Sequence, residues 1–229
     1  MARGSVPRRR TLPARYLVIM AKSPFLGVAK RRLAADIGAA AAIRLYRACL
    51  SHTCLHLASG GRWRTLLAVT PDREIAAQFW PRGVSRMAQG RGDLGQRMQR
   101  IFQCLPPGPA IIVGSDIPGI RATHIAKAFE LLGRADAVFG AAPDGGYWLV
   151  GLRRKPSLLK AFAKVRWSSP DALADTLANL EGKQLAFAQT LSDVDDDEAY
   201  RSHRALAERL LCRVAATDHA KNPDFLRSA

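Results

Sequence analysis

Short apolar runs that alternate with helical patterns constrain the fold of this chain more than any other feature. The clearest run is residues 110–114, Ala-Ile-Ile-Val-Gly, and a similar run covers residues 17–21. Runs of this length are typical of strands buried on both faces of a parallel sheet. Between them, apolar residues recur at helical spacing, as in residues 38–59 and 93–105. Because such strands and helices form right-handed crossover units, the pattern predicts an α/β fold, a three-layer sandwich with a mostly parallel mixed sheet.

The same patterns predict the remaining elements. Further strands are expected at residues 65–70, 84–88, 137–141, 145–152 and 185–188, and further helices at residues 73–80, 121–133, 168–181 and 196–213. The length of 229 residues fits a single α/β domain, which we place at residues 16–214. Residues 1–15 are expected to form a disordered basic leader, and residues 215–229 a C-terminal tail.

The chain is strongly basic, with a formal net charge of +16 at pH 7, and residues 1–15 contain arginines but no acidic residue. Positive potential concentrates anionic substrates such as nucleotides and sugar phosphates, but it also favours nucleic acid. No recognition-helix motif, zinc finger or aromatic RNA-binding strand accompanies the charge, so nucleic acid is disfavoured as the main partner. The 48% hydrophobic and 24% charged content excludes a disordered or fibrous protein.

The cysteines indicate a cytoplasmic protein, because Cys49, Cys54, Cys104 and Cys212 form no Cys-x-x-Cys pair and no dense disulfide framework. The arginine-rich start is not followed by the apolar segment of a signal peptide. The nearest apolar stretch, residues 16–21, is too short to cross a bilayer. We therefore expect a cytoplasmic location and no membrane span.

Ser115-Asp116-Ile117-Pro118 directly follows the strand at residues 110–114. Ligands of open α/β sheets bind at the carboxyl ends of the strands, so a carboxylate there is held at the binding edge. Mg²⁺ and Mn²⁺ prefer hard oxygen ligands and usually share them with substrate phosphates. Asp116 is therefore a candidate metal ligand and catalytic group, with Ser115 a candidate nucleotide contact. The alternative is that Asp116 caps the helix that follows.

A basic loop follows the first strand, over residues 22–33. Gly27 permits a ligand to approach the backbone closely, and Lys30 and Arg32 carry cations suited to phosphate oxygens. The loop is not a Walker loop, because the GxxxxGK[ST] pattern is absent. The alternative is a solvated basic loop that binds nothing.

Residues 90–98, Gly-Arg-Gly-Asp-Leu-Gly-Gln-Arg-Met, lead into a predicted helix. Backbone amides beside a helix N-terminus can cradle an anion, which makes Gly92, Asp93 and Arg97 candidate nucleotide contacts. Taken alone, Asp93 is better explained as the N-cap of the helix.

Residues 144–148, Asp-Gly-Gly-Tyr-Trp, combine a carboxylate, two flexible glycines and two aromatic rings. They could form an acceptor pocket in which Asp144 is a base and Gly145, Gly146 and Tyr147 contact a sugar. A tight Asp-Gly turn before a strand explains the same residues equally well.

A dense acidic run covers residues 193–198. Acidic residues at a helix N-terminus interact favourably with the helix dipole, so part of this run is structural. The run contains more acids than capping requires, and it is consistent with a second metal carboxylate, at Asp195 or Asp193.

Taken together and in order, six motifs resemble the bacterial glycosyltransferase-like family of the nucleotide-diphospho-sugar transferase superfamily, long described as a domain of unknown function. The motifs are KxPxxGxxKxRL (residues 22–33), GDLGxRM (92–98), GSDIP (114–118), DGGYW (144–148), RWSS (166–169) and SDVD (192–195). Six ordered motifs over about residues 15–200 are far more specific than any one of them. The 2-phospho-lactate and molybdenum-cofactor guanylyltransferases are similar in fold but more distant.

The resemblance implies a GT-A-like, Rossmann-like fold and a divalent metal, Mg²⁺ or Mn²⁺. It implies that Lys22, Lys30 and Arg32 contact nucleotide phosphates, and it adds Trp167 of the RWSS motif to the acceptor pocket.

The resemblance also implies that Asp116 binds the metal. A late acidic motif supplies the second ligand in related nucleotidyltransferases, and Asp195 matches it best, with Asp193 next. The chain departs from the family pattern at residues 196–199, which leaves the register of the second ligand open within residues 193–197.

The function implied by the resemblance is a metal-dependent glycosyltransferase that moves a sugar from a nucleotide sugar to an unidentified acceptor. The alternative is a nucleotidyltransferase that joins an NTP to a phosphorylated small molecule and releases pyrophosphate. Nucleotidyltransferases of this fold commonly carry a glycine-rich loop after the first strand, whereas Gly27 is the only glycine in residues 22–33. A third reading is a non-catalytic nucleotide- or RNA-binding protein, whose RNA affinity would be sensitive to salt.

Overall fold

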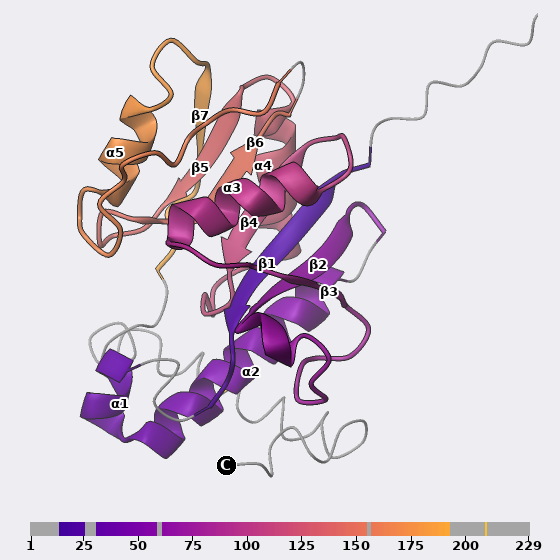
Figure 1. The fold of residues 1–229 in the computed structure, drawn as a ribbon, viewed down its shortest axis with the longest axis vertical. Helices are drawn as coiled ribbons and strands as arrows, with labels where there is room; N and C mark the ends of the chain where they lie inside the picture. The colour runs from indigo at the N-terminus through magenta and orange to yellow at the C-terminus, as the bar shows by residue number, and fades with distance from the viewer. Residues whose placement is uncertain (1–13, 26–30, 59–60, 155–156, 193–208, 210–229) are drawn as a thin grey trace, which may run out of the picture.

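A single sheet forms the centre of the molecule in the computed structural model, which describes residues 14–25, 31–58, 61–154, 157–192 and 209. Its strands are β1 (Tyr16–Lys22), β2 (Arg64–Thr70), β3 (Ser85–Ala88), β4 (Ala110–Gly114), β5 (Ala137–Ala141), β6 (Tyr147–Leu152) and β7 (Leu185–Ala188). They lie in the order β3-β2-β1-β4-β6-β5-β7 (Figure 1). Of these strands, β6 is antiparallel to both of its neighbours, and the other pairs are parallel.

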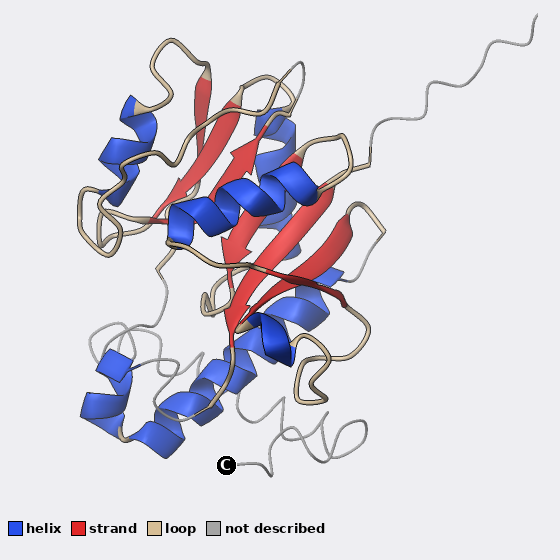
Figure 2. Ribbon diagram, in the orientation of Figure 1, coloured by secondary structure: helices blue, strands red, loops and turns tan. Residues whose placement is uncertain are grey.

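Helices cover both faces of the sheet (Figure 2). They are α1 (Arg31–Ile37), α2 (Ala39–Ala58), α3 (Leu94–Cys104), α4 (Ala122–Leu132) and α5 (Ala172–Ala178), with a 3-10 turn, η1, at Asp72–Glu74. Figure 2 shows α3 and α5 in front of the sheet, with α2 and α4 behind it. None of the helices within the described ranges has both the length and the apolar character needed to cross a membrane.

The two layers of core arise from the alternation of side chains along each strand. In β1, Leu17 and Ile19 pack with α2 and α4, whereas Tyr16 and Val18 pack with α3 and the segment before α5. Because both faces are covered, a strand must be apolar at nearly every position, which is why the strands read as continuous apolar runs. The predicted fold class, a three-layer α/β sandwich with a mostly parallel mixed sheet, is confirmed.

All seven predicted strands are present, with ends that differ by at most two residues from those expected. The helix predicted at residues 73–80 is wrong, because only η1 forms there. Side chains take the backbone carbonyls that a helix would use: Arg86 of β3 donates to the carbonyl oxygens of Ile75 and Ala77, and Trp80 donates to that of Glu74.

Two further helices differ from expectation. The helix α1 was not anticipated within the basic loop, and the helix expected from residue 168 begins only at Ala172. Ser168 has a φ of 60°, in the left-handed region, so the chain cannot be helical there. The helix predicted at residues 196–213 and the boundaries of the leader and the tail lie almost entirely outside the described residues and stay predictions.

A substitution at Gly151 of β6 can measure how densely the core is packed between β4 and β5. A Cβ at this position would lie 2.6 Å from Val138 Cγ1 and 3.0 Å from Ile111 Cγ1. Overpacking of a dense core typically costs about 1–3 kcal/mol, so we expect Gly151→Ala to lower the free energy of unfolding in urea by this amount. Gly119→Ala is the control, because its Cβ would meet no atom within 4 Å. Equal stability of the two variants would contradict the packing described here.

Candidate active site

The carboxyl ends of β1, β4 and β5 meet at one edge of the sheet, as their parallel directions require. Three of the predicted loops therefore begin at the same edge: the loop after Lys22, the loop at Ser115–Pro118, and the turn at residues 142–146. The antiparallel strand β6 separates β4 from β5 and starts at this edge with Tyr147. The structure thus brings the first residues of three motifs to one side of the molecule.

Asp116 lies immediately beyond the end of β4, and its carboxylate is turned back toward Gly114. An ideal Cβ on Gly114 would lie 3.0 Å from Asp116 Oδ1, so the glycine leaves the space that the carboxylate occupies. The alternative that Asp116 caps the next helix is wrong, because α4 begins at Ala122 with Arg121 as its N-cap residue. Asp116 is partly exposed at the edge of the sheet, where a carboxylate can reach a ligand.

Lys22 is held to Ser115 by a residue that the sequence analysis did not assign to the site. Tyr46 of α2 accepts a hydrogen bond from the Lys22 amide at 2.9 Å and donates to the Lys22 carbonyl oxygen at 3.0 Å. The same hydroxyl lies 3.2 Å from Ser115 Oγ. The backbone of Lys22 is therefore fixed, while its side chain is exposed at the candidate edge.

Arg47, the neighbour of Tyr46, holds the next part of the loop. It is almost fully buried and donates to the carbonyl oxygen of Pro24 at 3.1 Å. Burial lowers the pKa of the Arg47 guanidinium, because desolvation disfavours the charged form. The sequence carried a signal for this pair, since two polar residues stand on the apolar face of a predicted helix, but it could not show which groups they bind. Gly27, Lys30 and the side chain of Arg32 lie outside the described part of the chain.

Gln89 anchors the glycine-containing loop before α3 to the same edge. Its buried side chain donates to the carbonyl oxygens of Ala21 at 3.0 Å and Ala68 at 2.8 Å. The amide of the next residue, Gly90, donates to Asp72 Oδ1 at 3.0 Å. The loop is thus tied to the ends of β1 and β2.

Asp93 is the N-cap of α3. Its Oδ1 accepts from the Gln96 amide at 2.8 Å, and Gln96 Oε1 accepts from the Asp93 amide at 3.1 Å, a complete capping box. Gly92 has a φ of 104°, a conformation that favours glycine, and its carbonyl oxygen accepts from Arg97 Nε at 2.9 Å. These contacts account for Asp93 and Arg97 structurally, and their role in nucleotide binding stays a prediction.

The turn after β5 is fixed from within and from α5. Asp144 Oδ1 accepts from the Gly146 amide at 2.9 Å, and Asp144 is exposed. Gly145 has a φ of 83°, and a Cβ there would overlap the carbonyl oxygen of Pro170. The turn therefore packs directly against the chain that leads into α5.

Tyr147 and Trp167 pack among core side chains at this edge. The Tyr147 ring lies edge-on to Phe139, and its hydroxyl lies 3.4 Å from Thr176 Oγ1. Burial raises the pKa of Tyr147, because the phenolate form would be desolvated. Trp167 is partly buried, with its ring 6.4 Å from that of Tyr147 and against Gly95. The contact of these rings with an acceptor stays a prediction.

The described chain returns to the candidate edge just before the acidic run. Beyond β7, the amide of Leu191 donates to the carbonyl oxygen of Ala141, the last residue of β5. Asp193 and Asp195, the predicted second metal ligands, lie outside the described residues. Within those residues, no group of three or more His, Cys, Asp and Glu side chains could hold a metal ion.

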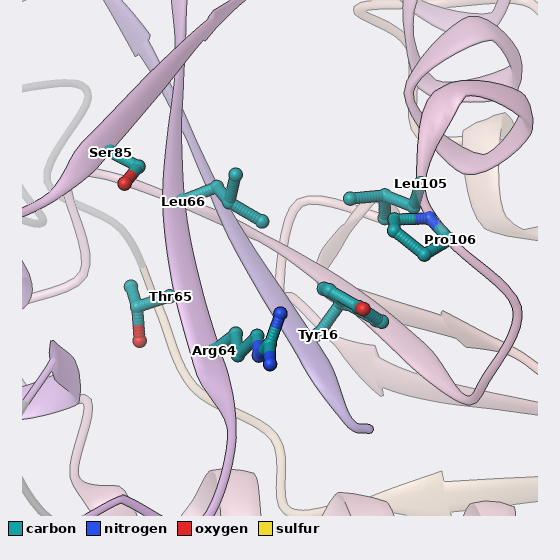
Figure 3. A pocket seen from close by; sticks show the side chains of 7 residues that line it. All are labelled: Tyr16, Arg64, Thr65, Leu66, Ser85, Leu105 and Pro106. Atoms are coloured by element: carbon teal, nitrogen blue, oxygen red, sulfur yellow. The ribbon is translucent and has the colours of Figure 1, made fainter. Parts of the chain in front are cut away.

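A surface pocket of about 380 Å³ lies at the opposite edge of the sheet (Figure 3). It is lined by Tyr16, Arg64, Thr65, Leu66, Ser85, Leu105 and Pro106. Because β1, β2 and β3 begin at this edge, the pocket is separate from the candidate site.

Comparison with solved structures identifies the class of fold. A candidate nucleotide-diphospho-sugar transferase from Desulfovibrio desulfuricans G20 aligns with a TM-score of 0.75 and 24% identity, over 86% of this chain and 97% of that chain. CMP:2-keto-3-deoxy-manno-octonic acid synthetase, solved with CTP, aligns with a TM-score of 0.51 and 13% identity, over 86% and 99% of the two chains. The 4-diphosphocytidyl-2C-methyl-D-erythritol synthase of Anaerococcus prevotii DSM 20548 aligns with a TM-score of 0.52 and 10% identity, over 86% of this chain and 99% of that chain. The chain shares its fold with these solved structures.

The chain belongs to the family described as an uncharacterized protein conserved in bacteria (DUF2064), whose model matches residues 53–169, more than half of the chain. A search of the curated proteins finds no match.

The capping role of Asp93 can be separated from a role of its charge. Loss of an N-cap side chain typically costs about 1 kcal/mol, so Asp93→Ala should lower the free energy of unfolding by this amount. Asp93→Asn keeps a good cap and should be close to the wild type in denaturant unfolding. If both variants were equally destabilised, the negative charge and not the cap would be the stabilising feature.

Proposed function

We propose that the protein is a metal-dependent transferase that binds a nucleotide sugar and transfers the sugar to an acceptor. One observation carries the proposal: Tyr46 joins Lys22 to Ser115 at the carboxyl edge of two adjacent parallel strands, and Asp116 follows Ser115 at the same edge. This edge is where open α/β sheets bind their ligands. The fold shared with nucleotide-diphospho-sugar transferases supports the same reading.

The described residues fit one side of a divalent metal site. Asp116 offers hard carboxylate oxygens at a partly exposed position, as Mg²⁺ and Mn²⁺ require, and Asp195 or Asp193 would supply a second carboxylate. Such an ion offsets the negative charge of a diphosphate leaving group. Lys22, with Lys30 and Arg32 of the same loop, would bind the phosphate oxygens. Their positive charges would also offset the negative charge of the leaving diphosphate.

Asp144 is the proposed base for the acceptor hydroxyl. One of its oxygens accepts a hydrogen bond from the Gly146 amide, which holds the carboxylate in place. The second oxygen would then accept the proton of the acceptor hydroxyl. Its exposure at the carboxyl edge allows an acceptor to approach, and general-base catalysis requires hydrogen-bond reach to the attacking hydroxyl.

A nucleotidyltransferase is the second candidate, favoured by the fold that the chain shares with the CMP:2-keto-3-deoxy-manno-octonic acid and 4-diphosphocytidyl-2C-methyl-D-erythritol synthases. In this case the basic loop would bind the β- and γ-phosphates of an NTP. A non-catalytic nucleotide- or RNA-binding protein is the third candidate, which the charge of +16 allows.

The product released distinguishes the three functions. The protein is incubated with Mg²⁺ or Mn²⁺ and a panel of nucleotide sugars and NTPs, and free nucleoside diphosphate and pyrophosphate are measured. Water serves as the acceptor in this assay, so nucleoside diphosphate and free sugar formed slowly from a nucleotide sugar are expected. Pyrophosphate and nucleoside monophosphate formed from an NTP would support the nucleotidyltransferase instead, and binding with neither hydrolysis would support the third candidate.

Removal of the Asp116 charge should abolish most of this turnover. We expect Asp116→Asn to reduce the rate by about a hundredfold or more, the usual effect of losing one group that stabilises developing charge. Glu130→Gln, which changes an exposed carboxylate of α4, is the control and should keep the wild-type rate. Full activity of Asp116→Asn would show that the metal site has been assigned to the wrong carboxylate.

A further inference from the structure

The backbone of β1 extends beyond the end of β4 at the candidate site. In a parallel strand, the N–H and C=O of one residue point to the same side, and those of the next residue point to the other. The Tyr16 amide bonds to Pro109 before β4, whereas the Ser23 amide bonds to Thr70 of β2, so even-numbered residues of β1 face β4. The strand β4 ends at Gly114, opposite Met20. The backbone groups of Lys22 therefore face a position where β4 offers no partner.

The Tyr46 hydroxyl takes the place of that missing partner. It binds both Lys22 groups at hydrogen-bond distance, 2.9 Å to the amide and 3.0 Å to the carbonyl oxygen. Tyr46 itself is 3% exposed. Polar backbone groups that lose their partner away from water destabilise the folded state, so the phenol stabilises β1 at Lys22 on the side that β4 leaves open, while β2 pairs with the other side.

The number of protons then determines the role of Ser115. A phenol carries one proton, and Tyr46 donates it to the Lys22 carbonyl oxygen. The Lys22 amide brings its own proton to the phenol oxygen. For Ser115 Oγ and Tyr46 Oη, 3.2 Å apart, to share a hydrogen bond, Ser115 must be the donor. Ser115 then donates its proton to Tyr46, and its oxygen, which is 4% exposed in the protein alone, can act toward any further group only as an acceptor.

We propose that Tyr46 is a positioning residue of this site, which fixes Lys22 and Ser115 relative to each other and turns the Ser115 oxygen, as an acceptor, toward the ligand. This inference rests on the proposed function, because the ligand is the diphosphate with its divalent cation. A Ser115 acceptor is suited to a hydroxyl group or to the water shell of a hydrated cation, and not to a phosphate oxygen, which needs a donor.

The test uses inorganic pyrophosphate with Mn²⁺, a probe that does not depend on the unknown base. Titration calorimetry compares the wild type, Tyr46→Phe, Ser115→Ala and the double variant. Tyr16→Phe is the matched control, because it removes a phenol hydroxyl at the opposite edge of the sheet. We expect Tyr46→Phe to weaken pyrophosphate binding about tenfold, the effect of one or two buried hydrogen bonds, and Tyr16→Phe to leave the Kd unchanged.

The double variant tests the link between the two loops. If Tyr46 acts partly through Ser115, the two substitutions together weaken binding by less than the product of their separate effects. A merely structural Tyr46 would lower the free energy of unfolding but leave the Kd of the folded protein unchanged, and that result would overturn the proposal. Multiplicative effects would overturn it as well. Ser115→Ala, which leaves the bonds to Lys22 in place, keeps the test available if Tyr46→Phe folds poorly.

A failure of the proposed function can be told apart from a failure of the positioning role of Tyr46. A wild-type protein that binds neither pyrophosphate nor any nucleoside diphosphate with Mn²⁺ or Mg²⁺ would overturn the function. The unfolding free energies of the same four proteins would still decide whether Tyr46 and Ser115 are coupled, since additive losses would show that the hydroxyl does not join the two loops.

Discussion

The parallel hydrogen bonding of β1 to both β2 and β4 is the constraint on which the rest of the structure depends. It directs three consecutive strands of the sheet the same way, so that the segments that follow them emerge at one edge. Both faces of these strands are covered by helices, which leaves the edge as the place where polar side chains can gather. The position of the candidate site is thus a consequence of strand direction before any side chain is considered.

The unequal lengths of β1 and β4 explain why α2 contributes to the site. The strand β1 extends beyond the end of β4, and the Tyr46 hydroxyl provides the substitute partner for its backbone there. On its other side β1 is paired with β2 along its whole length, and Gln89 adds a side-chain hydrogen bond to the Ala21 carbonyl oxygen. Tyr46 lies on α2, which carries none of the predicted ligand contacts, and Gln89 begins the loop that holds the predicted contacts Gly92 and Asp93. The geometry of the candidate site therefore depends on side chains that do not themselves need to touch a ligand.

The sequence predicted those features that depend on near neighbours in the chain. The apolar runs identified every strand, and the Asp93 cap was foreseen because its partner Gln96 is three residues away. The failed helix at residues 73–80 depends on Arg86, and the role of Tyr46 depends on segments 24 and 69 residues away. No local pattern contains such information. The Asp-Gly-Gly-Tyr-Trp segment likewise could not show that Tyr147 turns its hydroxyl toward Thr176.

The segment that leads into α5 has a consequence for how the family can vary. It presses Trp167 against Gly95 at the start of α3 and Pro170 against Gly145 in the turn after β5, with less space at each point than one methyl group requires. At residue 95 the added carbon would also meet the Cβ and the backbone carbonyl oxygen of Phe162, each at 2.9 Å, so a smaller ring at 167 would not by itself make room. Among relatives, residue 95 should therefore stay glycine whichever ring stands at 167.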